Sequence, residues 1–188
     1  MSNLNKVLPA IAPMCTDMWE HFPTLRHYAS QCQSVVEMGV RGGCSAYALA
    51  AGLEQSKAKD KWMVYLDIND CTNPELEKLS SEAGIQIEFH QADSRYVELP
   101  ECDLLFIDTL HTYGQLKTEL ELHHNKALKY IIMHDTSAPW GAKNEVDDGS
   151  PNKGLWPAIE EFVSDHSKEW KLEARHTNCH GLTILARK

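Results

Sequence analysis

The sequence predicts an α/β protein built on a doubly wound, mostly parallel sheet. Short apolar runs alternate with helical stretches from residue 34 onward, and the first run leads directly into a glycine-rich turn. Parallel strands need long crossover connections, so this alternation implies helices on both faces of the sheet. The chain has 188 residues, 43% of them hydrophobic, which suits one domain over residues 1–188.

Seven strands are expected. Five runs rich in apolar and β-branched residues have the length of buried parallel strands; they cover residues 34–38, 62–66, 85–90, 104–107 and 130–133. Two further runs, 170–175 and 181–186, are separated by a short polar link. We expect them to form an antiparallel hairpin that closes one edge of the sheet.

Helices are predicted between these strands, over residues 46–55, 74–83, 113–128 and 155–162. Asn73 followed by Pro74 is typical of a helix start. The leading segment 1–33 is expected to hold helices, since aromatic residues recur at helical spacing within it. Residues 137–153 have no period and contain several glycines and prolines. We expect this segment to be a mobile lid over the site; the alternative is a plain disordered insertion.

The composition argues against a membrane or secreted protein and against a nucleic-acid partner. No apolar run approaches the roughly 18 residues of a membrane span, and the first residues lack the plan of a secretory signal, so we expect a cytoplasmic protein without membrane contact. A net charge of −9 with scattered basic residues disfavours nucleic acid as a partner. The six widely spaced cysteines are predicted to be free thiols. Whether the protein forms a homo-oligomer is left open, because the aromatic N-terminal stretch can cover its own sheet or that of a second copy.

The glycine-rich turn after the first strand is the strongest local signal of a binding site. Glycines here let the backbone bend through positive φ and let a ligand approach, and the following helix presents free N–H groups. An ordinary strand-to-helix turn is the alternative. The residues that define the turn are Glu37, Gly39, Gly43 and Ser45.

Polar residues also follow the other four parallel strands. In a doubly wound sheet, ligands bind beyond the carboxyl ends of the strands, where these side chains should converge. Buried carboxylates are costly without a partner, so their repetition at strand ends favours a site. The residues concerned are Asp67, Asp93, Ser94, Asp108, His134 and Asp135.

At these residues the sequence resembles the class I S-adenosylmethionine-dependent methyltransferases, and within them the metal-dependent small-molecule O-methyltransferases. The resemblance covers residues 34–186 and implies a Rossmann-like methyltransferase fold. It implies that the turn from Glu37 to Ser45 approaches the methionine part of S-adenosylmethionine. It also implies that Asp67 holds the ribose hydroxyls and that Asp93 and Ser94 lie at the adenine edge.

The resemblance further implies a catalytic group at the fourth and fifth strand ends. In catechol-type relatives an acid after the fourth strand and a polar pair after the fifth hold magnesium, and a lysine three residues beyond the first acid serves as base. The corresponding positions here are Asp108, the pair His134 and Asp135, and His111. The resemblance implies that Asp108 contacts the cofactor, binds the metal and takes part in catalysis. An unperturbed imidazole, with a pKa of about 6.5, can deprotonate a hydroxyl at neutral pH. An imidazole ligand would favour Mn²⁺, Fe²⁺ or Zn²⁺ over Mg²⁺.

These observations predict methyl transfer to a hydroxyl of a small molecule or sugar. Two alternatives remain at this point. One is a methyltransferase that acts on protein or nucleic acid, which the acidic charge disfavours. The other is a non-catalytic domain that retains the fold.

Overall fold

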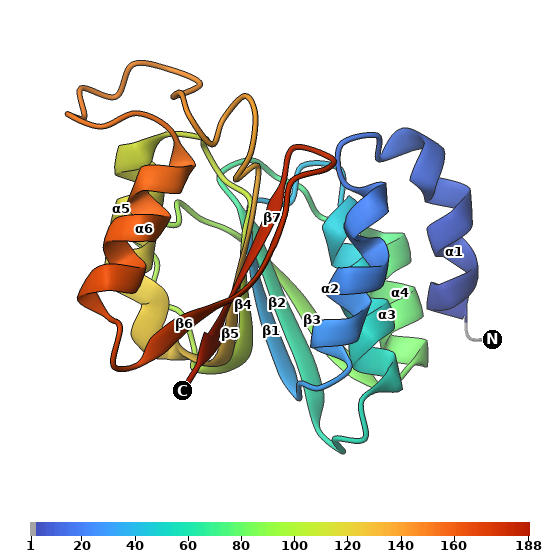
Figure 1. Ribbon diagram of the computed structural model, residues 1–188. Coiled ribbons are helices and arrows are strands. Elements are labelled where there is room, and N and C mark those ends of the chain that lie inside the picture. Colours follow the sequence, from blue (N-terminus) through green and yellow to red (C-terminus); the bar gives the residue numbers. More distant parts are fainter. Residues whose placement is uncertain (1–2) are drawn as a thin grey trace.

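A seven-stranded sheet forms the centre of the computed structural model, which describes residues 3–188 (Figure 1). The first two residues of the expected leading segment 1–33 lie outside this range. In spatial order the strands are β3 (Ile85–Gln91), β2 (Lys61–Asp67), β1 (Ser34–Met38), β4 (Cys102–Ile107), β5 (Ala127–His134), β7 (Leu182–Arg187) and β6 (Trp170–His176). Strands β1 to β5 pair in parallel, and β7 is antiparallel to both of its neighbours. The predicted fold class and the C-terminal hairpin are confirmed.

Helices cover both faces of the sheet (Figure 1). One side carries α1 (Asn3–Ile11), α2 (Phe22–Ala29), α3 (Cys44–Gln55) and α4 (Pro74–Glu82), with short 3₁₀ turns at Ala12–Met14 and Trp19–His21; the other side carries α5 (Tyr113–His123) and α6 (Leu155–Asp165). The Asn73 side chain caps α4 by accepting a hydrogen bond from Leu76 N at 3.0 Å. Among residues 3–188, no helix is long and apolar enough to cross a membrane.

The central strands are buried on both faces, which is why they read as continuous apolar runs. Alternate residues face opposite helix layers: Val35 and Leu104 pack in the cluster with α1 to α4, whereas Val36 and Leu105 pack in the cluster with α5 and α6. All four side chains are fully buried. This packing fixes the register of the sheet, because a one-residue slip would exchange the two sets.

The helix predicted over 113–128 is too long. It ends at His123, a 3₁₀ turn follows at His124–Lys126, and β5 begins at Ala127. Ala127 is buried in the sheet, while Leu128 is 46% exposed. The apolar residues at 127 and 128 therefore belong to a strand, and their helical spacing relative to Leu120 was coincidental.

The prediction of six free cysteines is wrong for two of them. Cys15 and Cys44 form a disulfide, with Cα atoms 5.8 Å apart. They are 29 residues apart in sequence, and the fold joins them because the leading segment passes over the start of α3. Spacing along the chain carries no sign of such a contact. The other four, Cys32, Cys71, Cys102 and Cys179, are free.

The chain changes direction within the sheet between β1 and β4. Strands β2 and β3 are added on one side of β1, and β4 and β5 on the other. The connections that leave the carboxyl ends of β1 and β4 therefore diverge to opposite faces and leave a crevice between them. The candidate site lies at this crevice.

Candidate active site

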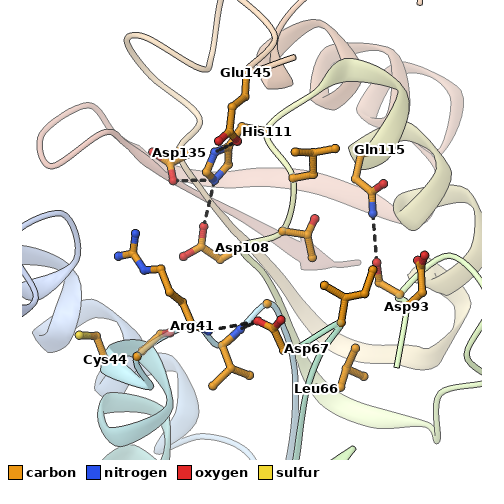
Figure 2. Close-up of a pocket in the computed structure, with 18 of the residues that line it drawn as sticks. Arg41, Cys44, Leu66, Asp67, Asp93, Asp108, His111, Gln115, Asp135 and Glu145 are labelled. Carbon is orange, nitrogen blue, oxygen red and sulfur yellow. Dashed lines mark hydrogen bonds and ion pairs between the residues drawn. The ribbon is translucent and has the colours of Figure 1, made fainter. Parts of the chain in front are cut away.

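A cavity of about 510 Å³ opens at the carboxyl ends of the parallel strands (Figure 2). Eight of the eleven residues predicted for the site line it: Gly39, Ser45, Asp67, Asp93, Ser94, Asp108, His111 and Asp135. Glu37, Gly43 and His134 do not reach its surface. Arg41, Gln115 and Glu145, which were not predicted as site residues, line it as well. The volume is in the range of small-molecule and cofactor sites.

Gly39 brings the first turn against the end of β4. Its φ is +85°, and its N–H donates to Leu66 O at 2.8 Å. A Cβ atom at this position would lie 2.0 Å from the carbonyl oxygen of Asp108. Glycine is therefore required here both by the left-handed backbone and by the close approach of the two chain segments.

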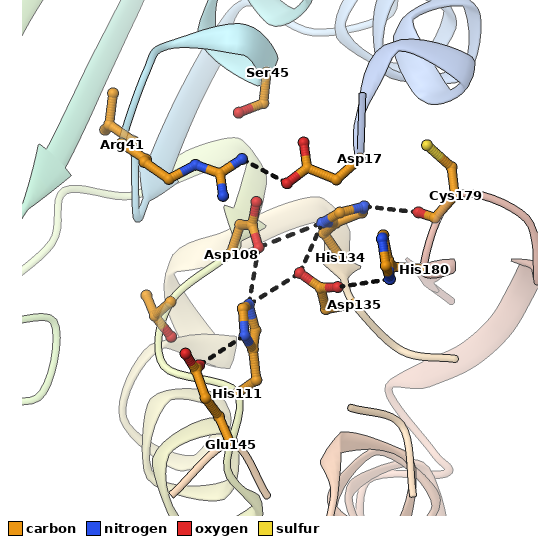
Figure 3. A network of polar contacts seen from close by, with 12 residues as sticks. Asp17, Arg41, Ser45, Asp108, His111, His134, Asp135, Glu145, Cys179 and His180 are labelled. Carbon is orange, nitrogen blue, oxygen red and sulfur yellow. Dashed lines mark hydrogen bonds and ion pairs between the residues drawn. The ribbon is translucent and has the colours of Figure 1, made fainter. Parts of the chain in front are cut away.

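Arg41 adopts a left-handed conformation in the same turn, with φ of +47°. Glycine reaches such a conformation without strain, whereas a residue with a Cβ atom adopts it less readily. The Arg41 guanidinium forms an ion pair with Asp17 of the leading segment, Nη2 to Oδ2, at 2.5 Å (Figure 3). Both residues line the cavity, so the leading segment forms part of its wall.

Glu37 lies behind the cavity. Its side chain is fully buried, Oε1 accepts a hydrogen bond from Ser45 Oγ, and Oε2 has no hydrogen-bond partner. Burial raises the pKa of this carboxyl to about 8, against the opposing effect of the Ser45 hydroxyl. Glu37 therefore contacts the cavity through Ser45, and direct contact with a ligand would require a rearrangement.

The buried Glu37 carboxyl predicts a loss of stability as pH rises. Its folded pKa lies above the unfolded value, so the folded state holds the proton more tightly, and stability falls between about pH 4.5 and pH 8. We expect the free energy of unfolding of Glu37→Gln to fall less over this interval than that of the wild type. Urea unfolding at pH 5, 6.5 and 8 measures the difference. Parallel pH dependences for the two proteins would contradict the assignment.

Asp67 holds the glycine-rich turn in place. Its Oδ2 accepts hydrogen bonds from the backbone N–H groups of Val40 at 2.9 Å and Arg41 at 3.1 Å. Its Oδ1 accepts from Asn69 N at 2.9 Å and from Asn69 Nδ2 at 3.4 Å. Burial alone would raise the Asp67 pKa, but these donors lower it overall. Protein groups occupy all four acceptor positions, and the contact with Asn69 Nδ2 is the longest.

The far end of the cavity is formed by the segment after β3. Asp93 binds Arg95, and Ser94 Oγ donates to the carboxylate of Glu119 at 2.6 Å. Gln115 reaches the same end from α5 (Figure 2). Sequence reasoning missed Gln115 and Glu119. Their spacing of four residues on a predicted helix was the only available signal, and it does not distinguish a site from a solvated face.

Two carboxylates and two imidazoles converge at the other end (Figure 3). His111 Nε2 lies 2.9 Å from Asp135 Oδ2 and 3.5 Å from Asp108 Oδ1. His134 Nδ1 lies 3.1 Å and 3.4 Å from the same two oxygens. The four side chains therefore lie together at the strand ends, as predicted from the sequence.

The cluster holds two positive and two negative charges when no other ion is present. Burial would lower the histidine pKa values, but Asp108 and Asp135 raise that of His111 to about 10 and that of His134 to about 11. Burial would raise the carboxyl pKa values, yet the histidines lower both. His111 is then protonated at neutral pH. The unperturbed pKa expected for a base does not apply to the metal-free cluster.

The donor set fits a divalent cation. One ligand atom from each of Asp108, His111 and Asp135 lies within 4.8 Å of the other two. Both ring nitrogens of His111 and Nδ1 of His134 are buried without a well-aligned hydrogen bond, although carboxylate oxygens lie close by. Converging lone pairs that are poorly aligned for hydrogen bonds suit an ion between them. Mixed carboxylate and imidazole ligands favour Mn²⁺, Fe²⁺ or Zn²⁺.

Each histidine is oriented through its second nitrogen. His134 Nε2 donates to the carbonyl oxygen of Cys179 at 3.0 Å, which leaves Nδ1 toward the carboxylates. His111 Nδ1 lies 2.9 Å from Glu145 Oε2, which leaves Nε2 toward them. A hydrogen bond such as that to Cys179 fixes the tautomer and the ring orientation of a metal-binding histidine. Glu145 holds the His111 ring by an ion pair that is not aligned as a hydrogen bond.

Glu145 belongs to the segment between β5 and α6, which runs above α5 and α6 (Figure 1). Its backbone N–H donates to the carbonyl of His111 at 2.9 Å, and Asn144 Oδ1 accepts from Tyr113 N and Gly154 N. The segment contains no helix or strand within the expected range 137–153. Its contact with His111 is consistent with a covering role, and the predicted lid motion stays a prediction.

Left-handed backbone is concentrated around the cluster. Among the described residues 3–188, the non-glycine residues with positive φ are Arg41, Asp135, Cys179 and His180. Asp135 and Arg41 line the cavity, Cys179 holds His134, and His180 Nδ1 lies 4.0 Å from Asp135 Oδ1. Strain of this kind persists where the surrounding structure enforces it, and it is common at functional sites.

Sequence comparison identifies the family. A model described as a methyltransferase domain matches residues 36–136, which is more than half of the chain and includes the turn, Asp67, Asp93, Asp108, His111 and Asp135. The chain belongs to this methyltransferase family. The resemblance to class I S-adenosylmethionine-dependent methyltransferases predicted from the sequence is confirmed. No curated protein sequence matches the chain.

Solved structures, several of them methyltransferases, share this fold at low sequence identity. An O-methyltransferase from Bacillus cereus in complex with S-adenosylhomocysteine (SAH) is 16% identical, with a TM-score of 0.61 over 98% of this chain and 90% of that one. A protein from Corynebacterium glutamicum is 15% identical, with a TM-score of 0.65; the match covers 89% of this chain and 80% of that one. The MycE methyltransferase of mycinamycin biosynthesis was solved with Mg, SAH and mycinamycin VI. It is 16% identical, with a TM-score of 0.59; the match covers 89% of this chain and 48% of that one.

Proposed function

We propose that this methyltransferase, acting as one domain, transfers a methyl group from S-adenosylmethionine to a hydroxyl of a small molecule or sugar, assisted by a divalent cation. The observation that carries the proposal is the position of the Asp108, His111, His134 and Asp135 cluster in and directly behind one end of the cavity. Neighbours of the same fold that were solved with SAH, and in one case with Mg, support it.

The donor would lie along the cavity from the cluster to Asp93. When bound, it supplies an electrophilic methyl group on a sulfonium sulfur. Gly39 and Ser45 would contact its methionine part, and Asp93 and Ser94 its base. Asp67 would accept from the ribose hydroxyls through Oδ1, in place of its contacts with Asn69 N at 2.9 Å and Asn69 Nδ2 at 3.4 Å. Glu37 and Gly43 would act indirectly, Glu37 by orienting Ser45 and Gly43 by shaping the start of α3.

The cluster would prepare the acceptor. Asp108 and Asp135, which belong to the group of possible ligands described above, would hold the cation together with His134, whose Nδ1 lies 3.4 Å and 3.1 Å from their carboxylate oxygens, while His111 of that group would stay unligated. When bound, the cation lowers the pKa of an acceptor hydroxyl and opposes protonation of nearby imidazoles. The His111 ring lines the cavity and its side chain is 20% exposed, whereas the His134 side chain is only 1% exposed, so His111 is the histidine nearer to an acceptor; Asp108, Asp135 and Glu145 surround its buried ring nitrogens, and an acceptor would have to displace one of these contacts to reach Nε2. We assign His111 as the base that takes the hydroxyl proton. Glu145 orients its ring.

The proposal is tested with purified protein, S-adenosylmethionine and a panel of catechols, phenols and sugars. We expect formation of SAH with at least one acceptor, loss of turnover on chelation with EDTA, and recovery on addition of Mn²⁺, Mg²⁺ or Zn²⁺. Methylated RNA or protein, with no small molecule methylated, would contradict the acceptor class. Turnover that is unchanged by exhaustive chelation would contradict the role of the cation.

A further inference from the structure

A buried carboxylate, Glu119, lies behind the end of the cavity that is remote from the cation cluster. It is 0% exposed and accepts three hydrogen bonds, from Ser94 Oγ at 2.6 Å, Gln115 Nε2 at 2.7 Å and Thr109 Oγ1 at 2.8 Å. All three donors line the cavity, while Glu119 does not. No step of the proposed methyl transfer uses this group.

The carboxylate fixes which atoms its three neighbours present to the cavity. An ionised carboxylate only accepts hydrogen bonds, so the Gln115 amide must direct its nitrogen, and not its oxygen, toward Glu119. The same nitrogen donates to Ser94 Oγ at 3.1 Å, so both of its N–H groups are engaged. The amide oxygen of Gln115 stays available as an acceptor. The hydroxyl protons of Ser94 and Thr109 also point to Glu119, which leaves only oxygen lone pairs for a ligand.

We propose that Glu119 is a positioning residue that makes this end of the cavity an acceptor surface for the exocyclic amino group of a purine base. The site would then prefer an adenine-containing donor over one with an oxygen at the same ring position. This inference rests on the proposed function, because it assumes that the base of S-adenosylmethionine lies between Asp93 and Gln115, which share this end of the cavity (Figure 2).

The ionisation of Glu119 supports this direction of its three hydrogen bonds. Burial raises its pKa to about 7, and the hydrogen bonds from Ser94, Gln115 and Thr109 oppose that rise. At pH 8.5 the group is ionised and accepts all three. An amide at this position offers a donor as well as an acceptor, so the Gln115 amide would be free to turn over and present its N–H groups to the cavity.

The test compares the binding of two ligands by calorimetry at pH 8.5: SAH and S-inosylhomocysteine, which carries an oxygen in place of the amino group. We expect the wild type to prefer SAH by about 10- to 100-fold, since a mismatch leaves buried acceptors facing each other. Glu119→Gln should lose most of this preference, chiefly by binding S-inosylhomocysteine more tightly. A structural defect alone would weaken both ligands equally.

Two further variants keep the outcome decisive. Gln115→Met removes the acceptor at the cavity surface with little change in volume, and should also lose the preference even if Glu119→Gln fails to fold. Glu121→Gln, an exposed residue of the same helix, should keep it. If folded Glu119→Gln and Gln115→Met both kept the wild-type preference for SAH over S-inosylhomocysteine, this inference would be wrong, while the proposed function would be unaffected. A wild type that binds neither ligand would refute the proposed function, and this inference with it.

Discussion

Gly39→Ala is expected to reduce the affinity for SAH by at least about 100-fold and to destabilise the fold by about 2–4 kcal/mol. The added Cβ would lie 2.0 Å from the carbonyl oxygen of Asp108, and the residue would have to keep a φ of +85°. The ends of β1 and β4 would have to separate, which would displace both the turn and Asp108. Calorimetric titration with SAH and urea unfolding measure the two effects.

Gly42→Ala is the matched control for this prediction. It lies in the same turn, but a Cβ there would meet no atom within 4 Å, and its φ is not in the left-handed region. We expect its stability to stay within about 0.5 kcal/mol of the wild type. Because Gly42 also lines the cavity, this variant is a control for stability and not for affinity. If Gly39→Ala bound SAH as tightly as the wild type, the turn would not be the donor site.

Asp135→Asn is expected to abolish turnover and to reduce Mn²⁺ affinity by more than about 100-fold, because it removes a carboxylate ligand together with its charge. The substitution suits this position, since Asp135 has a φ of +57° and asparagine tolerates left-handed backbone as well as aspartate does. The backbone is therefore preserved while the charge is lost. Binding of Mn²⁺ can be followed by electron paramagnetic resonance of the free ion.

Asp147→Asn provides the comparison for Asp135→Asn. Asp147 is an exposed carboxylate in the segment between β5 and α6, and it pairs with Lys153 at the surface. This variant should bind Mn²⁺ and turn over like the wild type. Both variants should retain SAH binding. An Asp135→Asn protein that still bound Mn²⁺ with wild-type affinity would show that the cation lies elsewhere.

The parallel strands of the sheet could be predicted because the central ones are buried on both faces and appear in the sequence as continuous apolar runs. Residues 34–38 were predicted as a strand, and Ser34–Met38 is the strand observed. Once the parallel strands were known, the rule that ligands bind at their carboxyl ends brought Asp108, His111 and Asp135 together. The structure bears out this convergence, with His111 Nε2 only 2.9 Å from Asp135 Oδ2.

The direction of Glu37 could not be predicted for the same reason. Every residue of β1 is buried, so the pattern of apolar residues does not distinguish the two faces. In the structure Val36 and Met38 face α5 and α6, whereas Glu37 lies between them and contacts Ser45 of α3. A residue at a strand end is therefore near a site without necessarily lining it.

The contacts of Glu145 and Cys15 depend on how irregular segments fold back, for which the sequence has no periodic signal. Glu145 reaches His111 because Asn144 is anchored to the first residue of α5, Tyr113, and to Gly154 at the start of α6. Cys15 reaches Cys44 because the leading segment passes over the glycine-rich turn. Neither contact follows from spacing or composition.

The central claim is that the methyl donor and the cation occupy one cavity side by side. Paramagnetic relaxation of the methyl protons of S-adenosylmethionine, labelled with ¹³C at the methyl carbon and bound together with Mn²⁺, tests it most directly. We predict strong line broadening of the methyl signal on addition of Mn²⁺, and its loss in Asp135→Asn. A methyl signal that stays sharp while both ligands are demonstrably bound would contradict the account.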